Sequence, residues 1–182
     1  MSTAKLSVVL AGFSFLILGS EWTLAQEGPN LGVPAAPEEV AAWDISISPD
    51  GDGLPGGSGT AAEGKGIYTA KCLACHGQGG QGFLNDKLVG GHGTLSGPAP
   101  VKTVGSYWPY ATTIFDYVRR AMPYLQPQTL SGEEVYALTA YLLFLNDIIT
   151  EDEVMNAQTL PRVNMPNQGN FILAYPSESQ LH

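Results

Sequence analysis

The sequence of 182 residues has only two cysteines, Cys72 and Cys75, and few basic residues: eight Lys and Arg stand against seventeen Asp and Glu. The net charge of -9 argues against a nucleic-acid partner, because neutralising phosphates requires clustered Lys and Arg. A partner steered by charge is expected to present a basic patch. A disulfide between the two cysteines would close a very short loop and stabilise the chain little.

The sequence also lacks an apolar run long enough to cross a membrane as a helix. Leu6 to Leu18 is apolar-rich and follows Lys5, but such a helix needs about 20 residues. Thr23 and Ala25 occupy the small-residue positions that precede a cleavage point. Residues 1–25 are therefore predicted to be a signal peptide that directs export to the periplasm and is removed, with an uncleaved anchor as the alternative.

Composition divides the remaining chain. A Pro- and Gly-rich N-terminal extension is expected to drape over the domain through Trp43 and Ile45 or Ile47. A domain of helices follows it, and a tail without clear periodicity ends the chain. The predicted ranges are 26–59 for the extension, 60–149 for the domain and 150–182 for the C-terminal tail.

Three helices and almost no strands are expected, which makes the fold class all-α. Residues 60–76 place Gly64, Tyr68, Cys72 and His76 at four-residue steps along one face. A second helix is predicted over 109–121, and an S-x-x-E capping box at Ser131 starts a third. Residues 77–107 are dominated by glycine and show no period. A segment of this length is expected to wrap something rather than form an empty loop.

The stretch KCLACHG at residues 71–77 carries the chemistry. A zinc site would need a second pair of ligands, and only His92 and His182 remain. A thioredoxin-like pair would stand at a helix start beside alternating strands and helices. C-x-x-C-H is typical of c-type haem attachment. The spacing predicts one covalent haem c, with Cys72 and Cys75 as thioether attachments and His76 as an axial iron ligand.

The second axial ligand is predicted to be Met122. It lies at a break between two helices and precedes Pro123, where a side chain can point back over a flat cofactor. Met155, Met165 and His92 are the alternatives. The methionines of the tail are expected to be surface or packing residues, and His92 a plain loop histidine.

Two aromatic donors precede the second helix. The hydroxyl of Tyr107 and the indole N–H of Trp108 could meet the haem propionates. The alternative is that both rings simply pack, with their polar tips in water.

The pattern G-x-x-x-Y-x-x-x-C-x-x-C-H, followed by Met-Pro and a closing helix with an aromatic residue, resembles class I cytochrome c over residues 60–149. The resemblance implies a fold in which the first and last helices cross near Gly64 and Tyr68 around one haem. By position, Cys72, Cys75, His76 and Met122 carry over as its thioethers and axial ligands.

A narrower resemblance extends over residues 37–171. The segments PEEVAAWDISISPDGDGLPGGSGT, VKTVGSYWPYATTIFDYVRRAMP and VYALTAYLLFLNDII look like the cytochrome subunit of the Sox sulfur dehydrogenase. That resemblance implies a molybdenum-cofactor partner of the sulfite oxidase type and a role in sulfur-compound oxidation. Typical members are longer and hold two haems, whereas this chain has a single C-x-x-C-H.

The expected function is therefore electron transfer rather than catalysis. The chain would serve as a mono-haem subunit of a periplasmic sulfur or sulfite dehydrogenase and pass electrons to an acceptor cytochrome or oxidase. One alternative is a free periplasmic electron shuttle. Another is a haem enzyme or gas sensor with an open iron site.

Overall fold

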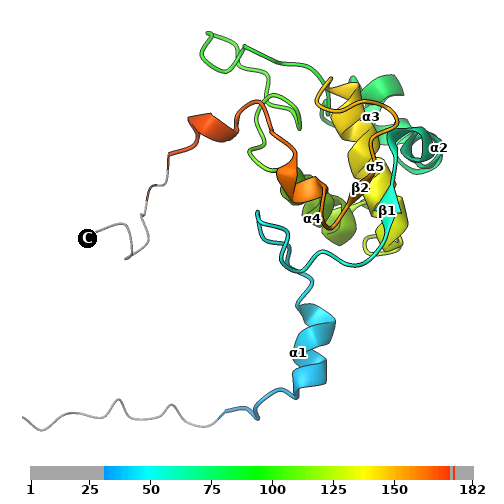
Figure 1. Cartoon of the computed structure of the whole chain (residues 1–182), viewed down its shortest axis with the longest axis vertical. Coiled ribbons are helices and arrows are strands. Elements are labelled where there is room, and N and C mark those ends of the chain that lie inside the picture. The colour runs from blue at the N-terminus through cyan, green and yellow to red at the C-terminus, as the bar shows by residue number, and fades with distance from the viewer. Residues whose placement is uncertain (1–30, 173, 175–182) are drawn as a thin grey trace, which may run out of the picture. The chain divides into compact units, whose positions relative to one another are not determined.

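The computed structural model describes residues 31–172 and 174 (Figure 1). The predicted signal peptide lies outside these residues. Residues up to Ala36 and residues from Pro37 onward form separate compact units, and residues 31–36 contain no helix or strand. The elements of the second unit are α1 (Pro37–Trp43), β1 (Ser58–Gly59), α2 (Ala61–Lys71), α3 (Leu73–His76), η1 (Gln78–Gly80), α4 (Ala111–Ala121), α5 (Gly132–Leu145), β2 (Met155–Asn156), η2 (Leu160–Arg162) and η3 (Gln168–Asn170).

The helix predicted over 60–76 divides into α2 and α3. Thr60 caps α2: its side chain accepts a hydrogen bond from the backbone N–H of Glu63, whose carboxylate accepts one from the Thr60 N–H. At Cys72 the backbone leaves helical geometry, with φ -121° and ψ -33°, and α3 begins one residue later. The cysteine–histidine turn is thus a separate short helix at the end of α2.

Glycine allows α2 and α5 to cross closely. A Cβ added to Gly64 would lie 2.0 Å from the carbonyl oxygen of Ala137, so no other residue fits at this crossing. One turn further along, the Tyr68 and Tyr141 rings lie 5.3 Å apart between their centroids. The crossing predicted at Gly64 and Tyr68 is present.

The third predicted helix, α5, begins at the expected capping box of Ser131 and Glu134. Every residue from Val135 to Leu143 is buried. The helix packs against both α2 and α4, and on the α4 side the Phe115 and Tyr136 rings lie 4.5 Å apart. An ion pair of 2.9 Å between Lys71 and Glu134 joins the end of α2 to the start of α5.

The N-terminal extension is tied to α4 and α5 by hydrogen bonds. The Ile47 N–H donates to the Asp116 carboxylate at 3.2 Å, and the Thr112 hydroxyl donates to the Pro49 carbonyl at 3.3 Å. The Tyr136 hydroxyl donates to the Pro55 carbonyl at 2.8 Å. Ile47 packs against the core, as expected.

The expected anchor at Trp43 is wrong. Its side chain is 86% exposed, because Trp43 closes α1, a helix in which no residue is buried. Packing of the extension begins only after this helix, at the segment that Asp116 and Thr112 hold.

The C-terminal tail contributes to the core of the same unit. Met155, Leu160 and Met165 are at most 2% exposed and belong to the main hydrophobic cluster. β2 pairs antiparallel with β1, with Gly59 opposite Met155. The tail therefore covers the helices, while the boundary predicted between residues 149 and 150 stays a prediction.

Helices dominate the described residues, and the two short strands form the two-stranded sheet among them. The predicted all-α class is confirmed. Within residues 31–172 and 174, none of the helices has the length and apolar character needed to span a membrane.

Candidate haem-attachment site

The site is a single turn of helix that carries Cys72, Cys75 and His76. The Cys72 carbonyl accepts hydrogen bonds from the backbone N–H groups of Cys75, at 3.1 Å, and His76, at 3.0 Å. Both cysteines are free thiols and partly buried. Gly77 ends the turn at φ +75°, a conformation that favours glycine.

The glycine-rich segment after the turn folds back on it. The Gly82 N–H donates to the His76 carbonyl at 2.8 Å, and the Asn85 N–H donates to the Cys75 carbonyl at 2.9 Å. On the other side, the buried Tyr68 hydroxyl donates to the Gly77 carbonyl at 2.8 Å. Hydrogen bonds to the carbonyl groups of Cys75, His76 and Gly77 therefore hold the turn in place.

The orientation of the His76 imidazole is set by a backbone carbonyl. Its Nδ1 lies 3.0 Å from the carbonyl oxygen of Asp86. A carbonyl oxygen can only accept, so Nδ1 carries the hydrogen in this contact, and in the neutral imidazole the lone pair is then on Nε2. This is the tautomer and orientation that a metal-ligating histidine requires.

Burial raises the pKa of the Cys72 thiol to about 11, and the neighbouring Cys75 adds to the shift. The protonated thiol is therefore the form of Cys72 at neutral pH in the chain by itself. Among the residues that the structure describes, no three His, Cys, Asp or Glu side chains gather in a group that could hold a metal ion.

Met122 follows α4 directly. Its backbone is extended, with φ -121° and ψ 148°, and its N–H donates to the Val118 carbonyl at 3.1 Å. The side chain is partly buried and packs against the same core as Cys72. Met155 and Met165 are core residues, and His92 is exposed on the glycine-rich loop.

Tyr107 and Trp108 are both partly buried, and each packs edge-on against another ring. Tyr107 lies 5.5 Å from Phe171 and Trp108 lies 5.6 Å from Tyr117, measured between ring centroids. Lys102 Nζ stands 4.9 Å from the centroid of the Tyr107 ring. Within the described part of the chain, their side-chain donors have no hydrogen-bond partner.

Comparisons with known proteins identify the fold. Residues 59–142 match the family model described as cytochrome C oxidase, cbb3-type, subunit III. A chain in the crystal structure of the sulfane dehydrogenase SoxCD from Paracoccus pantotrophus is 44% identical, with a TM-score of 0.74. That match covers 82% of this chain and 73% of the other. No curated protein matches the chain.

The chain belongs to the cytochrome c family. The resemblance inferred from the sequence is confirmed, and membership implies covalently bound haem c and electron transfer. The side chains of Cys72, Cys75 and His76 in this cytochrome fit a covalently bound haem c. Two free thiols stand one turn apart, and the imidazole beside them has its Nδ1 engaged and its Nε2 open.

The sequence analysis missed Asn146, which holds the glycine-rich loop of the cytochrome on α5. Its side-chain oxygen accepts from the Gly90 N–H at 3.2 Å, and its nitrogen donates to the Leu88 carbonyl at 3.1 Å. A Cβ on Gly105 would lie 2.3 Å from the same side chain. A polar residue at the end of an otherwise apolar helix is the signal that could have indicated this role.

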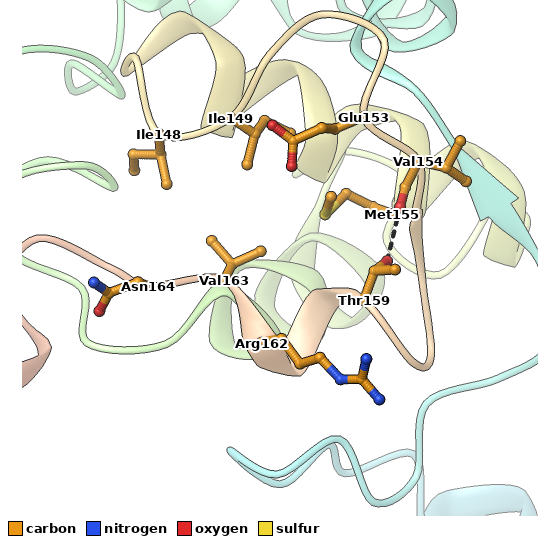
Figure 2. A pocket seen from close by; sticks show the side chains of 9 residues that line it. All are labelled: Ile148, Ile149, Glu153, Val154, Met155, Thr159, Arg162, Val163 and Asn164. Atoms are coloured by element: carbon orange, nitrogen blue, oxygen red, sulfur yellow. Dashed lines mark hydrogen bonds between the residues drawn. The ribbon is translucent and has the colours of Figure 1, made fainter.

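A separate pocket of about 510 Å³ lies beyond the end of α5, where the tail turns back (Figure 2). Ile148, Ile149, Met155 and Val163 form much of its lining, and Thr159 donates to the Val154 carbonyl at its edge. The predicted haem residues Cys72, Cys75, His76 and Met122 do not line it, whereas Met155, an alternative to Met122, does.

Proposed function

We propose that the chain is a mono-haem c-type cytochrome that transfers single electrons as the cytochrome subunit of a periplasmic molybdenum sulfur or sulfite dehydrogenase. The observation that carries the redox part is the Cys72–His76 turn, whose imidazole is oriented by the Asp86 carbonyl. When bound, haem c supplies an iron that gains or loses one electron without a bond being made or broken.

The protein's own residues have distinct parts in this proposal. Cys72 and Cys75 attach the haem as thioethers, which no longer titrate as thiols. His76 Nε2 and the Met122 sulfur would be the protein groups that hold the iron. A methionine opposite histidine raises the reduction potential relative to a second nitrogen ligand. With His76 and Met122 both holding the iron, no position would be open for a substrate, and the group would supply electron transfer alone.

Tyr107 and Trp108 are proposed to orient the haem through its propionates. Both side-chain donors lack a hydrogen-bond partner in the described part of the chain, and both rings are held by edge-on contacts with neighbouring rings. A donor whose ring is already fixed loses little side-chain entropy when it binds a carboxylate.

Support for the dehydrogenase role comes from the length of the similarity to the SoxCD chain. That similarity covers 82% of this chain, whereas residues 59–182 are only about two thirds of it. The shared region therefore includes residues before Gly59, outside the family-model match. Extensions shared with a chain of a dehydrogenase complex favour a bound subunit over a free shuttle.

Purification of the tagged, haem-loaded chain from a periplasmic fraction at several salt concentrations tests the proposal. We expect one haem per chain and a co-purifying protein that contains molybdenum, with reduction of the haem spectrum on addition of sulfite or a sulfane-sulfur donor. A chain that runs alone at every salt concentration would contradict the subunit role. A chain without a haem adduct by mass spectrometry would contradict the whole proposal.

A further inference from the structure

Helix α1 carries two apolar side chains, Val40 and Trp43, that stay largely exposed within the described part of its unit. Val40 is 51% exposed and Trp43 is 86% exposed, and no residue of the helix is buried. The two residues are three positions apart, so their side chains lie on the same face. In Figure 1, α1 is the helix drawn in blue to cyan. Tryptophan is highly buried on average, and together with Val40 on the same helix face it makes a small apolar surface that a partner could cover.

The base of this helix is held in place. Four residues after Trp43, the Ile47 N–H donates to Asp116, which also pairs with Arg120 at 2.7 Å. The Thr112 hydroxyl donates to the Pro49 carbonyl two residues further on. The helix is therefore joined directly to an anchored segment, which lowers the entropy cost of holding the helix at a partner.

The similarity to the SoxCD chain includes this region. The match covers 82% of this chain, and the residues from Gly59 to the end make up only about two thirds of it. Even if all of those residues belong to the match, about one seventh of the chain must be matched before Gly59. Followed back from Gly59 without a break, a stretch of that length takes in all of α1. Counted in this way, the exposed helix falls within the stretch that this chain shares with the SoxCD chain.

We propose that α1 is a docking arm whose Val40 and Trp43 insert into an apolar groove on the molybdenum-cofactor subunit. The inference rests on the proposed function and adds the surface that meets the partner. A short helix that lays an apolar face into a groove is a recurring mode of protein recognition. A tryptophan at the centre of such a contact commonly supplies much of the binding energy.

The test is titration of the haem-loaded full chain into the molybdenum-cofactor subunit of a Sox sulfur dehydrogenase, purified without its cytochrome subunit, followed by calorimetry. We expect Trp43→Ala to raise Kd by roughly tenfold or more, as removal of an interface anchor does. Val40→Ala is expected to weaken binding less. Val154→Ala is the matched control, because Val154 is 46% exposed and lies outside the arm. Its Kd should stay within about twofold of the unmodified chain.

Each outcome decides between the two proposals. Unchanged binding by Trp43→Ala, with clear binding by the unmodified chain, would overturn the docking arm and leave the dehydrogenase role in place. Equal weakening by Val154→Ala would also overturn the arm, as would a self-association of the chain that Trp43→Ala abolishes. No binding by the unmodified chain would overturn both. An unchanged haem spectrum and thermal transition of Trp43→Ala would show that the variant is folded.

Discussion

At the scale of single residues, Met122 is the predicted ligand with the clearest spectroscopic signature. Met122→Ala is expected to abolish the methionine-to-iron charge-transfer band of the oxidised protein. The reduction potential should fall by roughly 0.1 V or more, since axial ligands set haem potentials over a span of about 0.8 V. Optical spectroscopy and redox titration measure both effects.

The matched control is Met165→Leu, because Met165 is a core methionine at 2% exposure and leucine nearly conserves its volume. This variant should keep the band and the potential. Loss of the band in Met165→Leu, with retention in Met122→Ala, would show that the tail and not the end of α4 supplies the sulfur ligand.

Glu134 is a residue whose contribution depends on pH. Its pKa is lowered from the ordinary value of 4.5, first by the hydrogen bond with Lys71 and then by that with the Ser131 N–H. A carboxylate with a lowered folded-state pKa stabilises the protein above pH 4.5, and this contribution disappears as the pH falls through the lower folded-state value. Glu134→Gln keeps a capping side chain but removes the charge.

We expect Glu134→Gln to lower the free energy of unfolding by about 0.5 kcal/mol at pH 7, the range of a partly exposed ion pair. The difference should disappear at an acidic pH, below 4.5 and below the lowered folded-state pKa of Glu134. Denaturant titrations at the two pH values provide the measurement. Glu133→Gln removes an exposed carboxylate from the same helical turn and serves as the control. Equal effects of the two substitutions at pH 7 would contradict a specific role for the Lys71 pair.

Site residues could be predicted from the sequence only where the residues that act together are neighbours in the chain. Cys72, Cys75 and His76 fall within one turn, so their spacing alone indicates a haem attachment. The partner of His76 is a backbone carbonyl, a group that every residue has, and no sequence signal marks Asp86. Asn146 was missed for a related reason: its hydrogen bonds reach residues more than fifty positions away.

At the scale of the elements, the crossing of α2 and α5 depends on Gly64. In Gly64→Ala the new Cβ would meet the Ala137 backbone, so the helices must separate. We expect a loss of at least 2 to 3 kcal/mol, comparable to overpacking a well-packed core. Chemical denaturation of the haem-loaded protein measures it.

Gly66→Ala is the control on the same helix, since an added Cβ at Gly66 meets nothing within 4 Å. Alanine is favoured over glycine in a helix interior, and this variant should gain about 0.5 to 1 kcal/mol. If both alanines stabilised α2, the close helix crossing would be excluded.

The long helices were predictable because their signals lie within a few residues. Apolar periodicity and the Ser131 capping box located α5, and the T-x-x-E pattern at Thr60 was equally available for α2. The interruption at Cys72 was not predictable, because the helical spacing continues unchanged through it. The β1–β2 pairing joins residues almost one hundred positions apart, and two-residue strands have no period to detect.

At the scale of the whole molecule, the tail covers the helices rather than trailing from them. Deletion of residues 151–182 would expose core positions that Met155, Leu160 and Met165 now cover. Burial of such side chains contributes about 1.5 to 3 kcal/mol each. We expect the truncated, haem-loaded chain to lose about 5 kcal/mol and its Tm to fall by roughly 10 °C or more.

Calorimetry of the full and truncated chains measures this loss. Leu160→Ala, which removes a side chain of 0% exposure, should reproduce about 2 to 5 kcal/mol of it. Val154→Ala, at 46% exposure, should have little effect. A truncated chain with the Tm of the full chain would show that the tail does not support the core.

The sequence by itself determined the main helices and the family and predicted the haem-attachment turn, because the signals for each lie in residues that are close together in the chain. The tertiary structure decided which backbone carbonyl orients His76, how the glycine-rich loop is held by Asn146, and that the tail packs while Trp43 does not. These features depend on contacts between distant segments. A hydrophobic or polar pattern indicates that a residue can be buried, but only the folded chain shows which residues it packs against.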